Sequence, residues 1–537
     1  MLYSREMFWA DAIAEKIEKA YAKKIASKNA LVIRDEKTAS GRVHVGSLRG
    51  VAVHGIVADV LKERGVGEEY LYEINDFDPM DGLPVYLDTE KYLPHMGKPL
   101  CNVPSPDGKA TNYAEYFGQE FESVIRDVGF APKFYRSSTL YREGKFNETI
   151  RIALEHADKI REIYKRVSGS VRESTWLPVS VICESCGKIG TTKAVSFDGK
   201  EVAYICEPEM VTWAKGCGHQ GKISPFDGNA KLPWKVEWAA KFVVLDVSVE
   251  GAGKDHSTKG GAREIADAIS REVFDHEPPF DIPYEFFNIA GKKMSSSKGM
   301  GVSSRDIADL LPPELLRFLL IHKLPNQVID FAPDGDTVPV LYDNYDRFAE
   351  KYYADIKDDQ SRAFYLSNIP DKRKDIHAHY LPRFSSIATL EQMPHIDTFV
   401  EVAKLKGSEL TDEEMEEVRT RAMYAKKWLD EHAPEDYKLE VQTESVPERA
   451  RSLSPLQKKG INTVLAYIQS QEILDGQTLH TQLHEIRKAS GLEPKDFFSP
   501  IYLAILDKES GPKLGWFLSV LDRDFLEKRL EKVSKLT

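Results

Sequence analysis

The sequence predicts an α/β protein built on a parallel sheet, with an inserted region, a cysteine-rich element and an all-helical C-terminal part. A strand, a glycine-bearing loop, a helix and a second strand follow one another within residues 29–74. Strand patterns return at residues 241–289, and beyond about residue 330 the pattern is helical to the end. A strand–helix–strand unit of this length is typical of parallel sheets with crossover helices.

The composition is that of a globular protein. Of 537 residues, 42% are hydrophobic and 29% are charged, which excludes a disordered or fibrous chain. The 73 basic and 85 acidic residues give a net charge of −12, which argues against coating nucleic acid through bulk charge but not against a local basic groove. The chain has neither an apolar run of about 18–20 residues nor an N-terminal apolar signal core. We therefore expect a cytoplasmic protein with no membrane partner.

The first elements define the beginning of the sheet. Residues 29–34 are apolar enough for a buried strand, and the polar segment 35–46 is predicted as a loop. Residues 47–64 carry apolar side chains at helical spacing, with Gly65 and Gly67 ending the helix. A second strand is predicted at residues 70–74 immediately afterwards.

The later elements are an insertion followed by a return to the sheet. Helices are predicted at residues 112–128 and 148–167, and a short β-like run at 202–205. The sheet pattern resumes with a strand at 241–249, a helix at 261–274 and a strand at 284–289. No internal repeat and no low-complexity segment interrupts this order.

Two of the loops after strands carry unusual chemistry. Ligands of open parallel sheets bind beyond the carboxyl ends of the strands. In the loop at residues 40–47, Gly46 lets a base or phosphate approach the backbone at a helix start, and His44 can donate a hydrogen bond to it; the alternative is a plain glycine helix start with a surface histidine. In the segment 291–299, lysines separated by small hydroxyl residues form either a cationic clamp suited to a leaving pyrophosphate or a solvated basic linker.

Four of the five cysteines lie within 35 positions and predict a zinc site. Cys183 and Cys186 form a CxxC-Gly knuckle, which places two thiolates near one metal ion. Cys206 and Cys217 complete a tetrahedron, with His219 as a substitute for Cys206. Free buried cysteines are the alternative, and Cys101 stands apart from the group.

The two loops together resemble the HIGH and KMSKS signatures of class I aminoacyl-tRNA synthetases. HVGS at residues 44–47 corresponds to the first and KMSSSKG at 293–299 to the second. The chain is most similar to the class I lysyl-tRNA synthetases, along nearly its whole length. Further segments in that family's order are FWAD at 8–11, NDFDPM at 75–80, KLPWKVEW at 231–238 and GKDH at 253–256.

This resemblance implies a division into domains and a reaction. It implies a Rossmann-type catalytic domain at residues 1–75 and 226–330, an acceptor-stem insertion at 76–180, a zinc-binding element at 181–225 and a helical anticodon-binding domain at 331–537. The implied reaction is ATP-dependent aminoacylation of tRNA(Lys) with L-lysine through a lysyl-adenylate, with ATP, Mg²⁺ and Zn²⁺ as cofactors. We expect a monomer that works as a lysine–tRNA ligase.

The resemblance also assigns residues to the nucleotide. Activation is an in-line displacement at the α-phosphate, so the protein positions the reactants and stabilises charge without a nucleophile of its own. The catalytic residues are His44, Lys293 and Lys298. The ATP-binding residues are His44, Gly46, Ser47, Lys293, Ser295, Ser297 and Lys298, with Ser47 in place of the signature's last histidine. Asp76 and Asp78 either help to hold Mg²⁺ or the tRNA 3′ end, or form a turn before Pro79.

A lysine pocket needs a partner for the buried ammonium group. The resemblance carries the family's lysine-binding positions onto Thr38, Trp234, His256 and Tyr284. Where the family has an acid, this chain has Arg34, so Asp35 is assigned to the ammonium and Glu237 is a further candidate.

Two other classes of function compete with this one. A nucleotidyltransferase such as a cytidylyltransferase shares the HIGH-type sheet, but the helical tail of about 200 residues argues against it. A synthetase-like protein that binds tRNA without catalysis would be expected to lose Lys293 and Lys298, and both are present.

Overall fold

The computed structural model describes residues 7–291, 302–393 and 396–536. The chain forms two compact units, one made of residues 1–331 and 347–377 and the other of residues 332–346 and 378–537. In the described residues, no helix combines the length and apolarity that crossing a bilayer requires.

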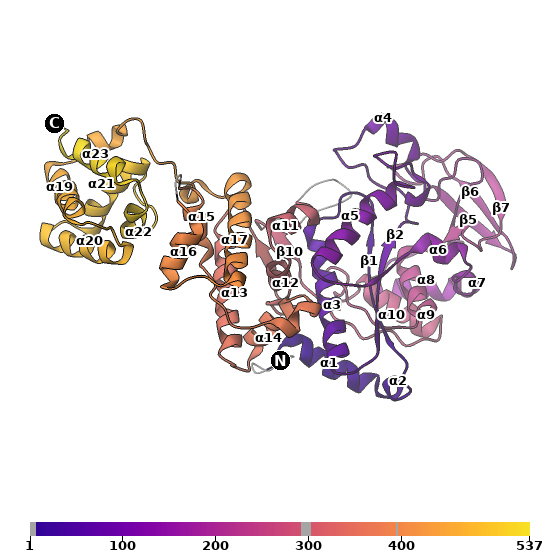
Figure 1. The fold of residues 1–537 in the computed structure, drawn as a ribbon. Helices are drawn as coiled ribbons and strands as arrows, with labels where there is room; N and C mark the ends of the chain where they lie inside the picture. Colours follow the sequence, from indigo (N-terminus) through magenta and orange to yellow (C-terminus); the bar gives the residue numbers. More distant parts are fainter. Residues whose placement is uncertain (1–6, 292–301, 394–395, 537) are drawn as a thin grey trace. The chain divides into compact units, whose positions relative to one another are not determined.

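A four-stranded parallel sheet forms the centre of the first unit (Figure 1). Its strands, in spatial order, are β3 (Lys133–Arg136), β2 (Glu68–Asn75), β1 (Leu31–Thr38) and β9 (Val247–Val249). Helix α3 (Leu48–Glu63) connects β1 to β2, so the predicted βαβ unit is confirmed. Nearly all of α3 is buried, because its apolar side chains cover the sheet while other helices pack on its far side.

The strand predicted at residues 241–249 is wrong for most of its length. Helix α9 (Trp234–Val244) occupies the first part, and only β9 is extended. The run of Lys241 to Val244 continues a helix that begins after Pro233, and a short apolar run cannot be assigned by periodicity alone. Conversely, β1 extends through Thr38 into the segment predicted as a loop, because it pairs with β2 as far as Asn75.

Two other predictions differ in detail. The single helix predicted at 148–167 is two helices, α7 (Asn147–Glu155) and α8 (Ala157–Ser168), separated at His156. The strand predicted at 284–289 is shortened to β10 (Phe287–Ile289), which pairs with β11 (Ile329–Phe331) outside the main sheet.

The inserted region combines helices with small antiparallel sheets. The helices are α4 (Thr89–Tyr92), α5 (Tyr113–Asp127) and α6 (Ser137–Arg142), together with α7 and α8. The cysteine-rich element contains the antiparallel strands β5 (Thr192–Phe197), β6 (Val202–Cys206) and β7 (Gln220–Ile223). Strands β4 (Ser180–Val181) and β8 (Ala230–Lys231) pair at its base.

Further helices complete the first unit. They are α1 (Trp9–Ala20), α2 (Ala22–Ala26), α10 (Ala262–Glu272), α11 (Ser304–Leu310), α12 (Pro313–Ile321) and α14 (Asp359–Ser367). Helix α13 (Thr337–Tyr353) spans the boundary between the two units.

The second unit is helical, as predicted. Its helices are α15 (Phe384–Leu390), α16 (Thr398–Lys406), α17 (Asp412–Glu431), α18 (Glu448–Arg451), α19 (Pro455–Ser470), α20 (Gly476–Ser490), α21 (Pro494–Leu506), α22 (Leu514–Ser519) and α23 (Arg523–Ser534). One apolar core joins α18 to α23, with Ile461, Leu483 and Leu530 fully buried.

Candidate functional site

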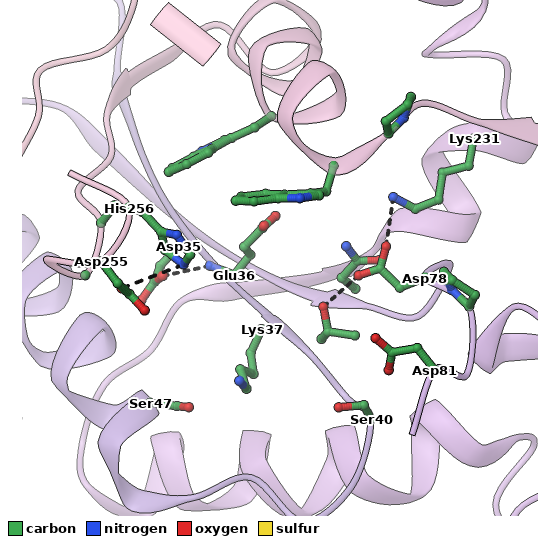
Figure 2. Close-up of a pocket in the computed structure, with 18 of the residues that line it drawn as sticks. Asp35, Glu36, Lys37, Ser40, Ser47, Asp78, Asp81, Lys231, Asp255 and His256 are labelled. Atoms are coloured by element: carbon green, nitrogen blue, oxygen red, sulfur yellow. Dashed lines mark hydrogen bonds and ion pairs between the residues drawn. The ribbon is translucent and has the colours of Figure 1, made fainter. Parts of the chain in front are cut away.

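A pocket of about 760 Å³ lies where the main strands end (Figure 2). Residues from the carboxyl ends of β1, β2 and β9 line it, together with the turn before α3, the start of α9 and part of the cysteine-rich element. This is the position at which open parallel sheets bind ligands.

The turn before α3 brings the predicted nucleotide residues together. His44, Gly46 and Ser47 all line the pocket, and the Ser47 N–H donates to the His44 carbonyl oxygen over 3.1 Å. A Cβ atom at Gly46 would lie 2.9 Å from His44 Nδ1 and 3.3 Å from the Phe287 carbonyl oxygen. Glycine is therefore required here, because the imidazole ring packs directly over the backbone. Lys293, Ser295, Ser297 and Lys298 lie outside the described residues.

The side of the pocket formed by β1 and α3 is acidic. Asp35 Oδ1 accepts the Glu36 N–H over 2.8 Å, whereas its buried Oδ2 atom accepts no hydrogen bond from the described residues and lies 3.4 Å from His54 Nδ1. A Cβ atom at Gly50 would come within 2.7 Å of both Asp35 Oδ2 and the Tyr284 hydroxyl oxygen. Glycine in α3 thus lets both groups reach the pocket, and burial raises the pKa of Tyr284.

Aromatic rings form another wall. Trp234 stacks on Trp238 with ring centroids 6.1 Å apart, and the His256 ring lies 5.4 Å from the Trp234 ring. All three residues line the pocket, and Trp234 is 45% exposed. Figure 2 shows His256 beside Asp255 and Asp35, on the opposite side from Asp78 and Asp81. The indole rings suit the aliphatic stem of a substrate whose charged end faces the acidic side.

Thr38 lies between these walls, at the end of β1. Its hydroxyl donates to Asp78 Oδ2 over 2.8 Å, and Asp78 also pairs with Lys231 at 3.0 Å. Asp78 lines the pocket. Asp76 instead turns into the protein and accepts hydrogen bonds from the backbone N–H and hydroxyl of Ser138.

Glu237, the other candidate for the ammonium, is already engaged. Its carboxylate pairs with Lys231 at 2.5 Å and Lys241 at 3.3 Å, and it accepts the Tyr141 hydroxyl over 2.8 Å. It is 1% exposed and is not among the residues that line the pocket. The geometry therefore favours Asp35 over Glu237.

A buried ion network lies beneath the pocket, on the face of β1 that carries Arg34 and Glu36. Arg34 pairs with Glu73 and Glu250, each at 2.6 Å, and with Glu36. Lys241 joins Glu36 at 2.7 Å to Glu73 at 2.8 Å. Burial opposes ionisation of Glu73, but Lys241 and Arg34 together hold its pKa below the ordinary value. We call these five residues the β1 ion network.

The four clustered cysteines meet in space. Their sulfur atoms all lie within 4.8 Å of one another, with Cys183 and Cys217 3.6 Å apart and Cys186 and Cys206 3.7 Å apart. Tetrahedral Zn–S bonds of about 2.3 Å require S···S separations of roughly 3.8 Å, so the donor set fits zinc. This group contains no histidine among the described residues; the His219 ring lies 5.9 Å from the Tyr204 ring instead.

The cysteine-rich element also reaches the pocket. Trp213, which lies between Cys206 and Cys217, lines the pocket together with Gly190 and Pro79. A Cβ atom at Gly190 would lie 2.5 Å from the Trp213 ring and 3.1 Å from Pro79. The fold around the cysteines therefore determines the position of one pocket wall.

Several pocket residues were not predicted from the sequence. Glu36, Lys37, Asp81, Trp213, Lys231, Trp238, Glu250 and Asp255 line the pocket as well. The position of Glu250 directly after β9 was the available signal, since strand ends meet at the site and the predicted strand also ended at residue 249. Trp213 had no local signal, because only the folded element brings it to the sheet.

Comparisons with known proteins agree with this arrangement. Residues 7–370 match the family described as tRNA synthetases class I (K), and residues 378–534 match a family described as anticodon binding domain. The lysine–tRNA ligase of Methanosarcina barkeri is 34% identical over 98% of this chain and 97% of that protein. The lysine–tRNA ligase of Archaeoglobus fulgidus is 31% identical over 98% of this chain and 99% of that protein. The chain belongs to the class I (K) family of tRNA synthetases.

Proposed function

We propose that the protein charges tRNA(Lys) with L-lysine at the expense of ATP. The observation that supports this most strongly is the pocket itself. It combines an acidic end at Asp35, indole walls at Trp234 and Trp238, and the glycine turn at Gly46, in a chain whose lysine–tRNA ligase relatives match it over nearly its full length. Such a pocket suits a substrate with an apolar stem, a terminal ammonium group and a reacting carboxylate.

The reaction divides into two displacements. A carboxylate oxygen of lysine attacks the α-phosphorus of ATP, and the bond to pyrophosphate breaks. A ribose hydroxyl at the tRNA 3′ end then attacks the acyl carbon, and AMP leaves. His44, Gly46 and Ser47 hold the nucleotide, and Thr38, Trp234, His256, Tyr284 and Asp35 hold lysine. Lys293 and Lys298, with Ser295 and Ser297, serve the pyrophosphate; this assignment comes from the sequence.

We assign zinc and magnesium different tasks. Cys183, Cys186, Cys206 and Cys217 would hold a structural zinc ion, because four thiolates leave no open coordination position. The loop between Cys206 and Cys217 would then be fixed with Trp213 against Gly190 and Pro79. Magnesium would be supplied with the ATP phosphates, and Asp78, which lines the pocket, is the carboxylate that would help to hold it. Residues 378–534 read the anticodon, and the protein works as a cytoplasmic monomer.

The experiment that tests the function is aminoacylation of total tRNA with each of the twenty labelled amino acids in turn, with ATP and Mg²⁺. We expect charging with lysine alone, and its loss in a Lys293→Ala, Lys298→Ala double variant that still binds tRNA. Charging with another amino acid would refute the lysine pocket. Absence of charging with any amino acid would favour the tRNA-binding alternative. Metal analysis of the purified protein tests the zinc assignment, which needs near-stoichiometric zinc.

A further inference from the structure

Two lysines line the pocket among the described residues, and their surroundings differ. Lys231 is paired with Asp78 and Glu237. The Lys37 ammonium group forms no hydrogen bond and no ion pair with any residue in the described ranges, although Asp35, Glu36 and Asp255 lie close enough to act on its charge. A half-buried ammonium group that opens into a pocket without a partner is available to a ligand.

Strand geometry sets the direction of this side chain. Side chains two residues apart in a strand share a face, so Lys37 lies on the same side of β1 as Asp35, toward α3. Asp35 reaches α3 at Gly50, and Ser47 precedes Gly50 by three residues at the helix start. Figure 2 shows Lys37 pointing toward the end of the pocket where Ser40 and Ser47 lie.

The positive charge of Lys37 near the start of α3 is unfavourable in the absence of a ligand. Helix α3 has 16 residues, and its N-terminus carries partial positive charge, which disfavours a neighbouring cation. Burial lowers the pKa of Lys37, while the three neighbouring carboxylates oppose that effect. An anion between the ammonium group and the helix start would relieve both the desolvation and the repulsion.

We propose that the Lys37 ammonium group contacts the α-phosphate of ATP and is a catalytic residue for activation of the amino acid. This proposal rests on the proposed function, since it takes the pocket as the site of adenylate formation. The side-chain ammonium group of the substrate lysine is attracted by Asp35 and repelled by Lys37. The substrate therefore lies along β1, with its side-chain ammonium group at Asp35 and its carboxylate directed toward the phosphate that Lys37 contacts.

The spacing along the strand supports this orientation. Residues two apart in a strand are separated by roughly 6.6 Å. The extended lysine side chain consists of five single bonds of about 1.5 Å each, which spans a similar distance. One β-strand thus presents an anion to one end of the substrate and a cation to the other.

The chemical role follows from the displacement. Attack by the carboxylate brings two anions together, and negative charge on the phosphoryl oxygens moves toward the bridging oxygen as the bond to pyrophosphate breaks. Lys37 keeps its proton throughout and acts by charge alone. Preorganised charge in a site that excludes water favours the transition state more than the separated reactants, so its loss lowers kcat as well as nucleotide affinity.

The test compares Lys37→Met and Lys37→Arg with Lys372→Met, in which a lysine that is 64% exposed and paired with Glu314 loses its charge. Binding of AMP and of adenosine to the full chain is measured by equilibrium dialysis, and binding of L-lysine is compared with that of lysinamide. We expect Lys37→Met to weaken AMP binding about tenfold and to leave adenosine unchanged. We expect kcat of charging to fall about a hundredfold, and Lys37→Arg to restore most of it.

The outcomes separate the proposal from its alternatives. Equal loss of AMP and adenosine binding, or a lower melting temperature for Lys37→Met, would mean a structural role and overturn the proposal. A loss confined to L-lysine relative to lysinamide would assign the ammonium to the substrate carboxylate and also overturn it. The measurements of AMP and adenosine binding do not depend on tRNA charging. A parent protein that fails to lysylate tRNA would refute the proposed function, and the comparison of AMP with adenosine would still decide whether Lys37 contacts the phosphate.

Discussion

The charged residues on the two faces of β1 differ in how fully other residues of the protein pair with them. On one face, Arg34 and Glu36 belong to the β1 ion network, in which each charge has at least one partner within hydrogen-bonding distance. On the other face, Asp35 Oδ2 accepts no hydrogen bond from the described residues, and Lys37 forms no ion pair among them. Both faces belong to one strand, so the same backbone carries both sets of charges.

The difference separates structural charges from functional ones. A buried ion pair is costly to break, because removal of one partner leaves the other charge desolvated. A buried charge with few protein partners has already incurred much of that cost in the folded state, so its removal destabilises the fold far less. Substitutions on the first face should therefore lower stability, and those on the second should lower activity alone.

The largest effect is expected from Arg34→Met. Glu73 and Glu250 would lose a partner at 2.6 Å and stay buried, which costs about 3–5 kcal/mol of unfolding free energy. Denaturation by urea, followed by circular dichroism, measures the shift of the midpoint. The activity that remains should follow the folded fraction.

Arg151→Met is the matched control. Arg151 pairs with Glu148 and Glu155 but is 40% exposed, so water screens these pairs and its loss should leave the urea midpoint almost unchanged. Equal stability of the two variants would show that the β1 ion network does not hold the sheet together.

The β1 ion network also predicts that the stability of the protein depends on pH. The pKa of Glu73 is lower in the folded protein than its ordinary value of 4.5, so its contribution to stability is complete above pH 4.5 and is lost as pH falls through the folded-state pKa. Arg34→Met removes one cause of that lowering. The stability gap between parent and variant should therefore narrow as the pH falls below 4.5. A difference in stability that grows as the pH falls would contradict the stabilising pairing of Glu73 with Arg34.

On the other face, Asp35→Asn should impair lysine binding without destabilising the fold. The amide keeps the shape and can still accept the Glu36 N–H, but it has no charge for the substrate ammonium. We expect the KM for lysine to rise about tenfold to hundredfold, with the KM for ATP unchanged. Asp81→Asn, at the other side of the pocket, is the control. A lower melting temperature for Asp35→Asn with a normal KM for lysine would show that Asp35 stabilises the fold and does not bind the substrate.

The sequence predicted the turn at His44 and Gly46 and the cysteine cluster because both depend on local patterns, glycine at a helix start and CxxC spacing. It predicted the β1 ion network not at all, and the segment that holds Arg34 and Glu36 was divided between a strand and a loop. Charged residues disfavour a buried strand unless partners arrive from elsewhere, and here Glu73, Lys241 and Glu250 come from other elements. Such pairing is tertiary information, as is the approach of Trp213 to the pocket.

The smallest effect is expected from Thr38, the last residue of β1, which lines the pocket. Thr38 ends β1 and donates to Asp78 Oδ2 over 2.8 Å, so Thr38→Val removes one hydrogen bond and leaves the size of the side chain unchanged. A single bond of this kind is worth about 0.5–1.5 kcal/mol, which corresponds to a rise of roughly twofold to tenfold in the KM for lysine. Combination with Asp78→Asn shows how Thr38 acts. If it acts by orienting Asp78, the double variant should be no worse than Asp78→Asn alone, whereas additive effects would mean that the hydroxyl binds the substrate directly.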